Sequence, residues 1–190
     1  MSIELCTFYE GYLYMTSLEN EETILYRMRL DGRYYEPLNR FQGTVPAMVI
    51  ENGKIYYLFN AAGEDQSGYV GCMGINGAEN RALVHMNNKD LEYCYMTGIV
   101  DNNNIYYTCS SGGSEMLNNL YCYSILDGNN RQISSECGRY VATSDEIDCI
   151  IFASSDGSEI RRMNKDGSNP RVMREENGSA WPWLSAWFLP

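Results

Sequence analysis

The 190-residue chain is poor in positive charge, with 14 Lys and Arg against 25 Asp and Glu and a formal net charge of −11. Proteins bind nucleic acids and anionic membranes through clustered Lys and Arg side chains, whereas here these side chains are scattered along the sequence. We therefore expect neither nucleic acid nor a membrane as a direct partner.

Histidine is almost absent, because His85 is the only one. Neither a nucleophilic triad nor a zinc site therefore has its usual residues. The context "LVHMNNKD" predicts that His85 lies in a surface loop. Adjacent carboxylates in "NEE" (20–22) and "EDQ" (64–66) are more typical of solvated turns than of a glycosidase pair. We expect no enzyme activity, no metal and no cofactor.

The sequence also lacks a CxxC pair, a basic start followed by an apolar run, and any apolar run near the ~18 residues of a membrane span. The cysteine count is odd, and most cysteines lie among apolar residues. We expect reduced, buried thiols in a cytoplasmic protein. The seven are Cys6, Cys72, Cys94, Cys109, Cys122, Cys137 and Cys149.

Tyrosine and glycine are abundant, at 16 and 17 residues, which favours short strands and tight turns. Four similar segments alternate apolar and polar residues and then reach Asp-Gly or Asn-Gly, which predicts a β-hairpin with a type I′ turn. The third segment, "YCYSILDG", has one extra residue, which a β-bulge would absorb. The turn positions are Asp31, Asn76, Asp127 and Asp166, spaced by 45, 51 and 39 residues.

Two further β-rich segments precede each hairpin. In the second unit they are "VPAMVIE" and "NGKIYYLF", and in the third "YCYMTGIVD" and "NNNIYYTC". Each unit is therefore predicted to contain four antiparallel strands, labelled A to D. The spacing of the units along the sequence is typical of β-propeller blades. We expect a single all-β domain over residues 1–190, a β-propeller built from four four-stranded antiparallel blades. The units are residues 1–42, 43–90, 91–136 and 137–178, with a closing segment at 179–190.

The segments "KIYY", "NIYY", "YRMRLDG" and "RRMNKDGSNPRVM" resemble repeats of bacterial β-propeller domains related to the low-density-lipoprotein-receptor propellers. The resemblance covers roughly residues 11–174. It implies a fold in which the paired aromatics pack between blades and Asp-Gly makes the C–D turn. Known members usually have more blades and many are secreted, so neither export nor receptor activity is implied for this chain.

A propeller buries both faces of every blade, so its ring has to close. Three alternatives are open: the tail packs on the first unit, two copies join as a homodimer, or the chain is a shortened form. The tail "NGSAWPWLSAWFLP" contains all three tryptophans, Trp181, Trp183 and Trp187. Such a terminal cluster favours core or closure over a recognition surface, although Trp is enriched at binding sites.

The leading functional hypothesis is a non-catalytic scaffold that binds a protein partner through loops on one rim of the propeller. The B–C connections of successive units are acidic, and loops on a rigid scaffold often carry binding. A lectin-like propeller that binds carbohydrate or a small molecule is the alternative, supported by repeated Tyr and Asn. The candidate binding residues are Glu19, Glu21, Glu22, Glu64, Asp65, Glu115, Trp181 and Trp183.

Overall fold

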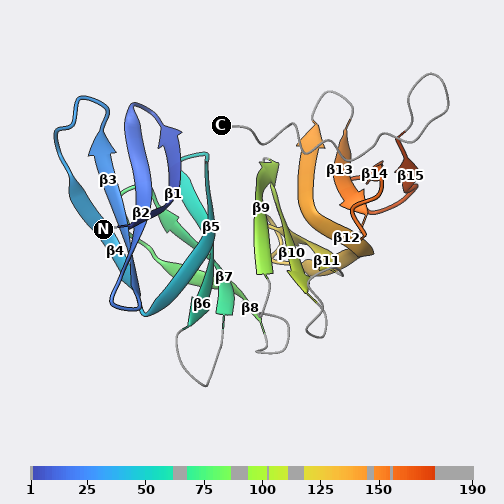
Figure 1. Ribbon diagram of the computed structural model, residues 1–190, viewed down its shortest axis with the longest axis horizontal. Helices are drawn as coiled ribbons and strands as arrows, with labels where there is room; N and C mark the ends of the chain where they lie inside the picture. Colours follow the sequence, from blue (N-terminus) through green and yellow to red (C-terminus); the bar gives the residue numbers. More distant parts are fainter. Residues whose placement is uncertain are drawn as a thin grey trace.

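The computed structural model describes residues 2–61, 68–86, 94–101, 103–110, 118–144, 148–154 and 156–173. These residues form antiparallel strands and no helix (Figure 1), which confirms the all-β prediction. Within them, no helix is long and apolar enough to span a membrane.

The strands form three sheets, each ordered as in the chain. The first sheet contains β1 (Ser2–Tyr9), β2 (Tyr12–Glu19), β3 (Glu22–Arg29) and β4 (Glu36–Phe41). The second contains β5 (Gly43–Glu51), β6 (Lys54–Ala61), β7 (Gly68–Gly74) and β8 (Arg81–Met86). The third contains β9 (Cys94–Asp101), β10 (Asn104–Ser110), β11 (Asn118–Ser124), β12 (Asn130–Ser144), β13 (Cys149–Ser154), β14 (Ile160–Asn164) and β15 (Arg171–Val172).

Three sheets therefore replace the four separate four-stranded blades that the sequence predicts. The difference lies in β12, whose first half pairs with β11 and whose second half pairs with β13. Cys137 is the crossover, since it pairs with Asn118 on one side and Ser154 on the other. Gly138 continues the strand against the Ser154 carbonyl, so no turn separates the third repeat (β9 to early β12) from the fourth (late β12 to β15).

The first strands of successive repeats contact one another in chain order: β1 contacts β5, β5 contacts β9, and β9 contacts β12. Figure 1 places the first sheet and the fourth repeat at opposite ends of the long axis. Across the part of the chain that the structure describes, the ring is not closed.

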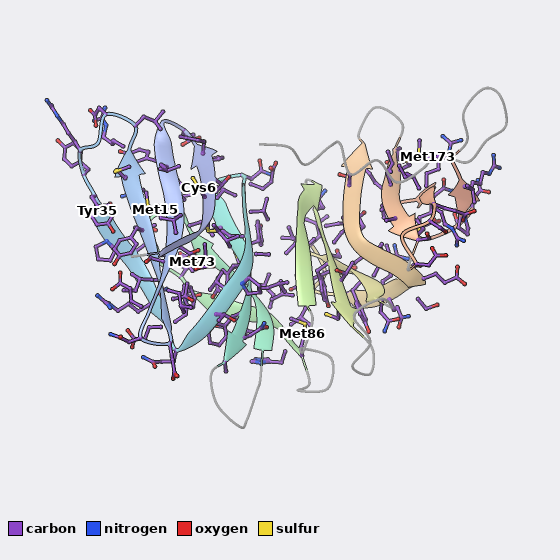
Figure 2. All side chains as sticks on the ribbon, viewed as in Figure 1. Cys6, Met15, Tyr35, Met73, Met86 and Met173 are labelled. Carbon is purple, nitrogen blue, oxygen red and sulfur yellow. The ribbon has the colours of Figure 1, made fainter. Side chains whose placement is uncertain are left out.

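Apolar side chains fill the three interfaces between successive repeats (Figure 2). The paired tyrosines of the B strands divide between these interfaces, because successive strand residues point to opposite faces. Tyr57 packs toward the first sheet and Tyr56 toward the third repeat. Tyr107 and Tyr106 likewise pack toward the second sheet and the fourth repeat. The implied role of these aromatics between blades is confirmed.

The cysteines with described side chains are free thiols, and five of these six are buried. Burial raises the pKa of the Cys137 thiol to about 12, which keeps it protonated. Cys6 is exposed, so the prediction of burial is wrong there. Cys6 lies on β1, the edge strand of the first sheet, on the outer face, which is the face away from the second sheet. Met15, its partner on the next strand inward, is buried.

The Asp-Gly and Asn-Gly dipeptides lie at the predicted turns between C and D strands, but the turn type differs. Gly32, Gly77 and Gly167 have φ of 78°, 79° and 89°, whereas none of the preceding Asp and Asn residues has a positive φ. Each of these glycine N–H groups donates to the carbonyl three residues earlier at 2.9 Å. This is a type I turn followed by a glycine bulge, so the type I′ prediction is wrong.

The third turn differs from the other three because it accommodates the extra residue. Its Gly128 N–H donates to the Ser124 carbonyl, four residues earlier, at 3.0 Å. The additional residue therefore lies in the turn itself, and no bulge in the preceding strand is needed to absorb it.

Acid pH is expected to weaken the turn at Asp156, between β13 and β14. The Ser154 hydroxyl donates to this carboxylate at 2.6 Å, and with the Ser158 N–H and hydroxyl it lowers the Asp156 pKa to about 2. Because the folded-state pKa lies below the unfolded value of about 4, the carboxylate stabilises the fold above pH 4, and this contribution is lost as the pH falls toward 2.

Asp156→Asn should therefore lower the melting temperature at pH 7 and leave it nearly unchanged relative to wild type at pH 2. Circular dichroism melts between pH 2 and 7 measure this difference. An equal difference in melting temperature at pH 2 and at pH 7 would contradict the stabilising role of the Asp156 carboxylate.

Three D strands carry a β-bulge at the same apolar position. The pairing register skips Leu38 in β4, Leu83 in β8 and Ile133 in β12. A bulge redirects the side chain of the extra residue. Each of the three packs into the interface between its own repeat and the next.

The C–D turn of the following repeat rests on this bulge at two of the interfaces. A Cβ atom built on Gly77 would lie 2.6 Å from the Leu38 carbonyl oxygen, and one built on Gly167 would lie 2.6 Å from that of Ile133. An arginine of the preceding repeat also reaches each turn: Arg27 Nη1 donates to the Ile75 carbonyl at 3.3 Å, and Arg131 Nη1 to that of Asp166 at 3.5 Å. We call this arrangement turn docking.

Candidate functional site

The acidic residues of the B–C connection in the first unit lie in a tight hairpin. Asn20 and Glu21 both have positive φ, 51° and 68°, and form a two-residue turn between the paired Glu19 and Glu22. Glu19 accepts hydrogen bonds from the Ser17 and Tyr26 hydroxyls. Of the three glutamates, only Glu21 projects freely at the exposed tip of the turn.

Glu22 belongs to a separate polar cluster on the same sheet. It accepts a hydrogen bond from Gln42 and lies 3.5 Å from Arg40 Nη1. The remaining predicted site residues lie outside the described residues: Glu64, Asp65, Glu115, Trp181 and Trp183. Among the predicted site residues that the structure describes, Glu19, Glu21 and Glu22 lie on one hairpin.

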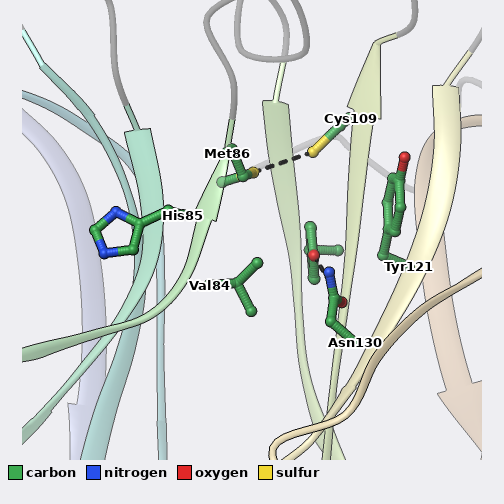
Figure 3. Close-up of a pocket in the computed structure, with 7 residues that line it drawn as sticks. Val84, His85, Met86, Cys109, Tyr121 and Asn130 are labelled. Atoms are coloured by element: carbon green, nitrogen blue, oxygen red, sulfur yellow. Dashed lines mark hydrogen bonds between the residues drawn. The ribbon is translucent and has the colours of Figure 1, made fainter.

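A pocket that the sequence did not predict lies between the second sheet and the third repeat (Figure 3). Its volume is about 110 Å³. The lining residues come from β8, β10, β11 and β12: Val84, His85, Met86, Tyr107, Cys109, Tyr121 and Asn130.

The pocket lies at the interface that lacks turn docking. A Cβ atom built on Gly128 would have only the Tyr123 hydroxyl within 4 Å, so this turn does not rest on the Leu83 bulge. The extra residue lengthens the turn, and Leu126 within it is 77% exposed. The one-residue insertion in "YCYSILDG" was thus the sequence signal for this difference, although it did not identify the lining residues.

The walls of the pocket are held by contacts within the third repeat and across the interface. The Tyr107 hydroxyl donates to Asn130 Oδ1 at 2.8 Å, and the Tyr107 ring stacks on Tyr121 with centroids 5.3 Å apart. At the other end of the pocket, the Cys109 thiol donates to Met86 Sδ at 3.4 Å. These contacts join β8 to β10, β11 and β12 (Figure 3).

The His85 ring points away from the Cys109–Met86 contact (Figure 3). It lies beside Tyr69, with ring centroids 6.0 Å apart. Val84 and Met86, its neighbours on β8, project to the opposite face because strand residues alternate. His85 is exposed, as the sequence predicts, but it lies in a strand and not in a loop.

The pocket combines apolar walls with the exposed amide of Asn130. Val84, Met86 and Tyr121 are half-buried and offer carbon and sulfur surface. The volume is well below the roughly 300 Å³ at which pockets for cofactors and drug-sized ligands begin. The geometry therefore suits one apolar side chain of a partner with a polar group beside it.

Comparison with known proteins identifies the fold. No family model matches the chain, and no curated protein matches it by sequence. Among solved structures, a nidogen–laminin complex matches with a TM-score of 0.64 and 12% identity, over 94% of this chain and 66% of that chain. A TolB-type protein from Agrobacterium tumefaciens matches with a TM-score of 0.63 and 19% identity, over 92% and 62%.

Enzymes match equally well. A prolyl endopeptidase gives a TM-score of 0.65 and 14% identity over 90% of this chain and 27% of that chain. An oligogalacturonate lyase in complex with manganese gives 0.64 and 11% over 85% and 49%. The chain spans about two thirds or less of each of these proteins. The likeness shows a β-propeller-type fold, and fold alone does not assign an activity.

Proposed function

We propose that this protein is a non-catalytic scaffold that binds a protein partner, with the pocket between β8 and β10–β12 as an anchor site. The observation that carries the proposal is the missing turn docking at this one interface. At the same interface the described residues leave a pocket for one side chain. Partners of repeat scaffolds commonly bind through a few such anchors.

The sequence that follows β10 supports an acidic contribution to partner choice. Cys109 lies one residue before the end of β10, and the B–C segment with Glu115 follows it in the sequence. Glu21 occupies the corresponding connection of the first sheet. We propose that these acidic connections favour a partner with basic residues beside its apolar anchor.

The four repeats are proposed to act as four propeller blades, the third and fourth joined through β12. The proposed location is the cytoplasm, which the free cysteines of the described chain support. Both proposals are independent of the pocket.

The lectin alternative has one observation in its favour, a recurring tyrosine–asparagine pair. Tyr57 donates its hydroxyl to Asn80 in the second sheet, as Tyr107 does to Asn130 in the third repeat. Both rings are almost fully buried, at 1% and 2% exposure, so neither offers a face on which a sugar could stack. This favours the protein-binding scaffold.

Peptides selected from a random phage-displayed library should bind the wild-type protein at least about tenfold more tightly than Val84→Phe, whose larger side chain fills the pocket. Leu126→Ala, exposed and outside the pocket, is the matched control and should bind as wild type does. Melting curves establish that each variant is folded, and Asn130→Ala tests the mouth of the pocket without filling it.

Selected peptides that bind Val84→Phe and Asn130→Ala as tightly as wild type would overturn the pocket as the anchor site. Binding on a glycan array that Val84→Phe abolishes, with no peptide enriched, would support the lectin alternative.

A further inference from the structure

The outer face of the first sheet has the composition of a packed interface between repeats. Its residues align one for one with those through which the second sheet packs on the first. The outer-face residues are Cys6, Phe8, Leu13, Met15, Met28 and Leu30, and their counterparts are Met48, Ile50, Ile55, Tyr57, Met73 and Ile75.

Several of the outer-face side chains are exposed, unlike their counterparts. Phe8 is 64% exposed, whereas Ile50 at the same place in the second sheet is 9% exposed. Leu30 and Ile3 are 61% and 58% exposed. Figure 2 shows Cys6 and Met15 on this sheet, with Tyr35 toward its far edge. At the centre of this face Met15 is already buried, at 4% exposure, so the exposed apolar area surrounds it. Burying these surrounding side chains would be favourable, which marks them as an interaction surface.

The first turn has the residues for docking but no bulge to rest on. Gly32 has φ of 78°, almost the same as Gly77, yet a Cβ atom built on it would have nothing within 4 Å. The neighbouring Leu30 corresponds to Ile75, whose carbonyl accepts from Arg27 at the first interface.

The fourth repeat presents the complementary half of the same interface. Arg162 stands where Arg27 stands in the first repeat. Arg27 is ion-paired with Glu36 on the next strand, whereas the strand partner of Arg162 is Arg171. Both arginines are exposed, and like charges directly opposite each other on a sheet are destabilising.

An acidic partner would relieve this repulsion, and the first sheet offers one. Residues 2–26 contain five glutamates and no Lys or Arg. Asp31 lies beside Leu30 in the undocked turn, where it is 3.8 Å from Arg29 Nε. Met173 follows β15 at the place that the bulge residues Leu38 and Leu83 occupy in their repeats. The fourth repeat thus has the arginine and the apolar residue that receive a docking turn.

These two surfaces lie at opposite ends of one chain (Figure 1). We propose that the fourth repeat of one copy packs on the outer face of the first sheet of a second copy, head to tail. Gly32 then rests near Met173, and Arg162 reaches the Leu30 carbonyl. Two copies that contact each other twice in this way form a closed ring with two-fold symmetry. The inference does not depend on the pocket.

The test uses the full chain and its mass in solution, measured by light scattering after gel filtration. Wild type is expected at the mass of two chains. Phe8→Glu, at an exposed position, and the pair Arg162→Glu with Arg171→Glu should each be folded monomers. Leu126→Glu, equally exposed but outside both surfaces, should remain a dimer.

Mixing the two monomeric forms distinguishes a head-to-tail contact from any other. Each keeps one intact surface, the fourth repeat in Phe8→Glu and the first sheet in the double arginine variant. Their mixture should therefore form a one-to-one complex. A wild-type monomer would overturn the proposal. So would a dimer that both variants retain, or monomers whose mixture forms no complex.

Discussion

Gly77→Ala and Gly167→Ala are each expected to lower the free energy of unfolding by about 3 kcal/mol, against about 1 kcal/mol for Gly11→Ala. All three glycines have similar positive φ, between 79° and 89°, so the backbone cost of a side chain is shared. The difference lies in the neighbour. A Cβ atom at residue 77 or 167 would lie 2.6 Å from a bulge carbonyl oxygen, whereas nothing lies within 4 Å at residue 11.

The clash cannot be relieved by rotating a side chain, because the opposing atom belongs to the backbone of Leu38 or Ile133. The turn has to move away from the preceding repeat, which loosens the apolar cluster beneath it. Urea unfolding of the three variants measures the difference. Equal losses at residues 11, 77 and 167 would show that φ alone accounts for the glycines and would contradict turn docking.

The repeated dipeptides and the alternating segments predicted the hairpin positions and the strand order within each repeat, whereas the placement of the paired tyrosines was implied by the family resemblance. This succeeded because each depends on local chemistry: a glycine after Asp or Asn, and a period of two along a strand. The turn type was wrong because two adjacent residues do not reveal whether the first adopts positive φ. The three-sheet arrangement was missed because the continuation of β12 through Gly138 depends on the contact with Ser154, which is distant in sequence.

The candidate site was less predictable than the fold. Acidic residues mark exposed connections, and Glu21 is indeed exposed, but Glu19 and Glu22 have partners on their own sheet. The pocket is lined by side chains that lie between Val84 and Asn130 in the sequence. No motif or repeat spacing in the sequence indicates that these side chains lie together. Its only trace in the sequence is the extra residue of the third turn, whose consequence is the loss of a contact with another repeat.

A side chain at residue 71 is also expected to destabilise the fold strongly. Gly71 does not have a positive φ, so the destabilisation comes only from the lack of space for a Cβ atom. Tyr57 pairs with Gly71 across β6 and β7, and its ring lies directly over the glycine. A Cβ atom there would be 2.3 Å from Tyr57 Cζ. The third repeat has Tyr121 at this position, and there the ring of Tyr107 stacks on Tyr121 instead of crossing over it.

Gly71→Ala should therefore displace the buried Tyr57 ring, break its hydrogen bond to Asn80 and lower the free energy of unfolding by about 3 kcal/mol. The loss should come from the ring and not from the strand, since alanine is no worse than glycine in a β-strand. In a Tyr57→Leu background the same change should accordingly cost less than about 1 kcal/mol.

Urea unfolding of wild type, both single variants and the double variant completes the cycle, with a coupling of about 2 kcal/mol expected between the two positions. Additive losses would mean that the ring and the glycine act independently, and the close approach over β7 would then not be what requires glycine at residue 71. Coupling would instead show that glycine at residue 71 is what lets the Tyr57 ring lie over β7. In the third repeat the Tyr107 ring reaches Asn130 while it stacks on Tyr121.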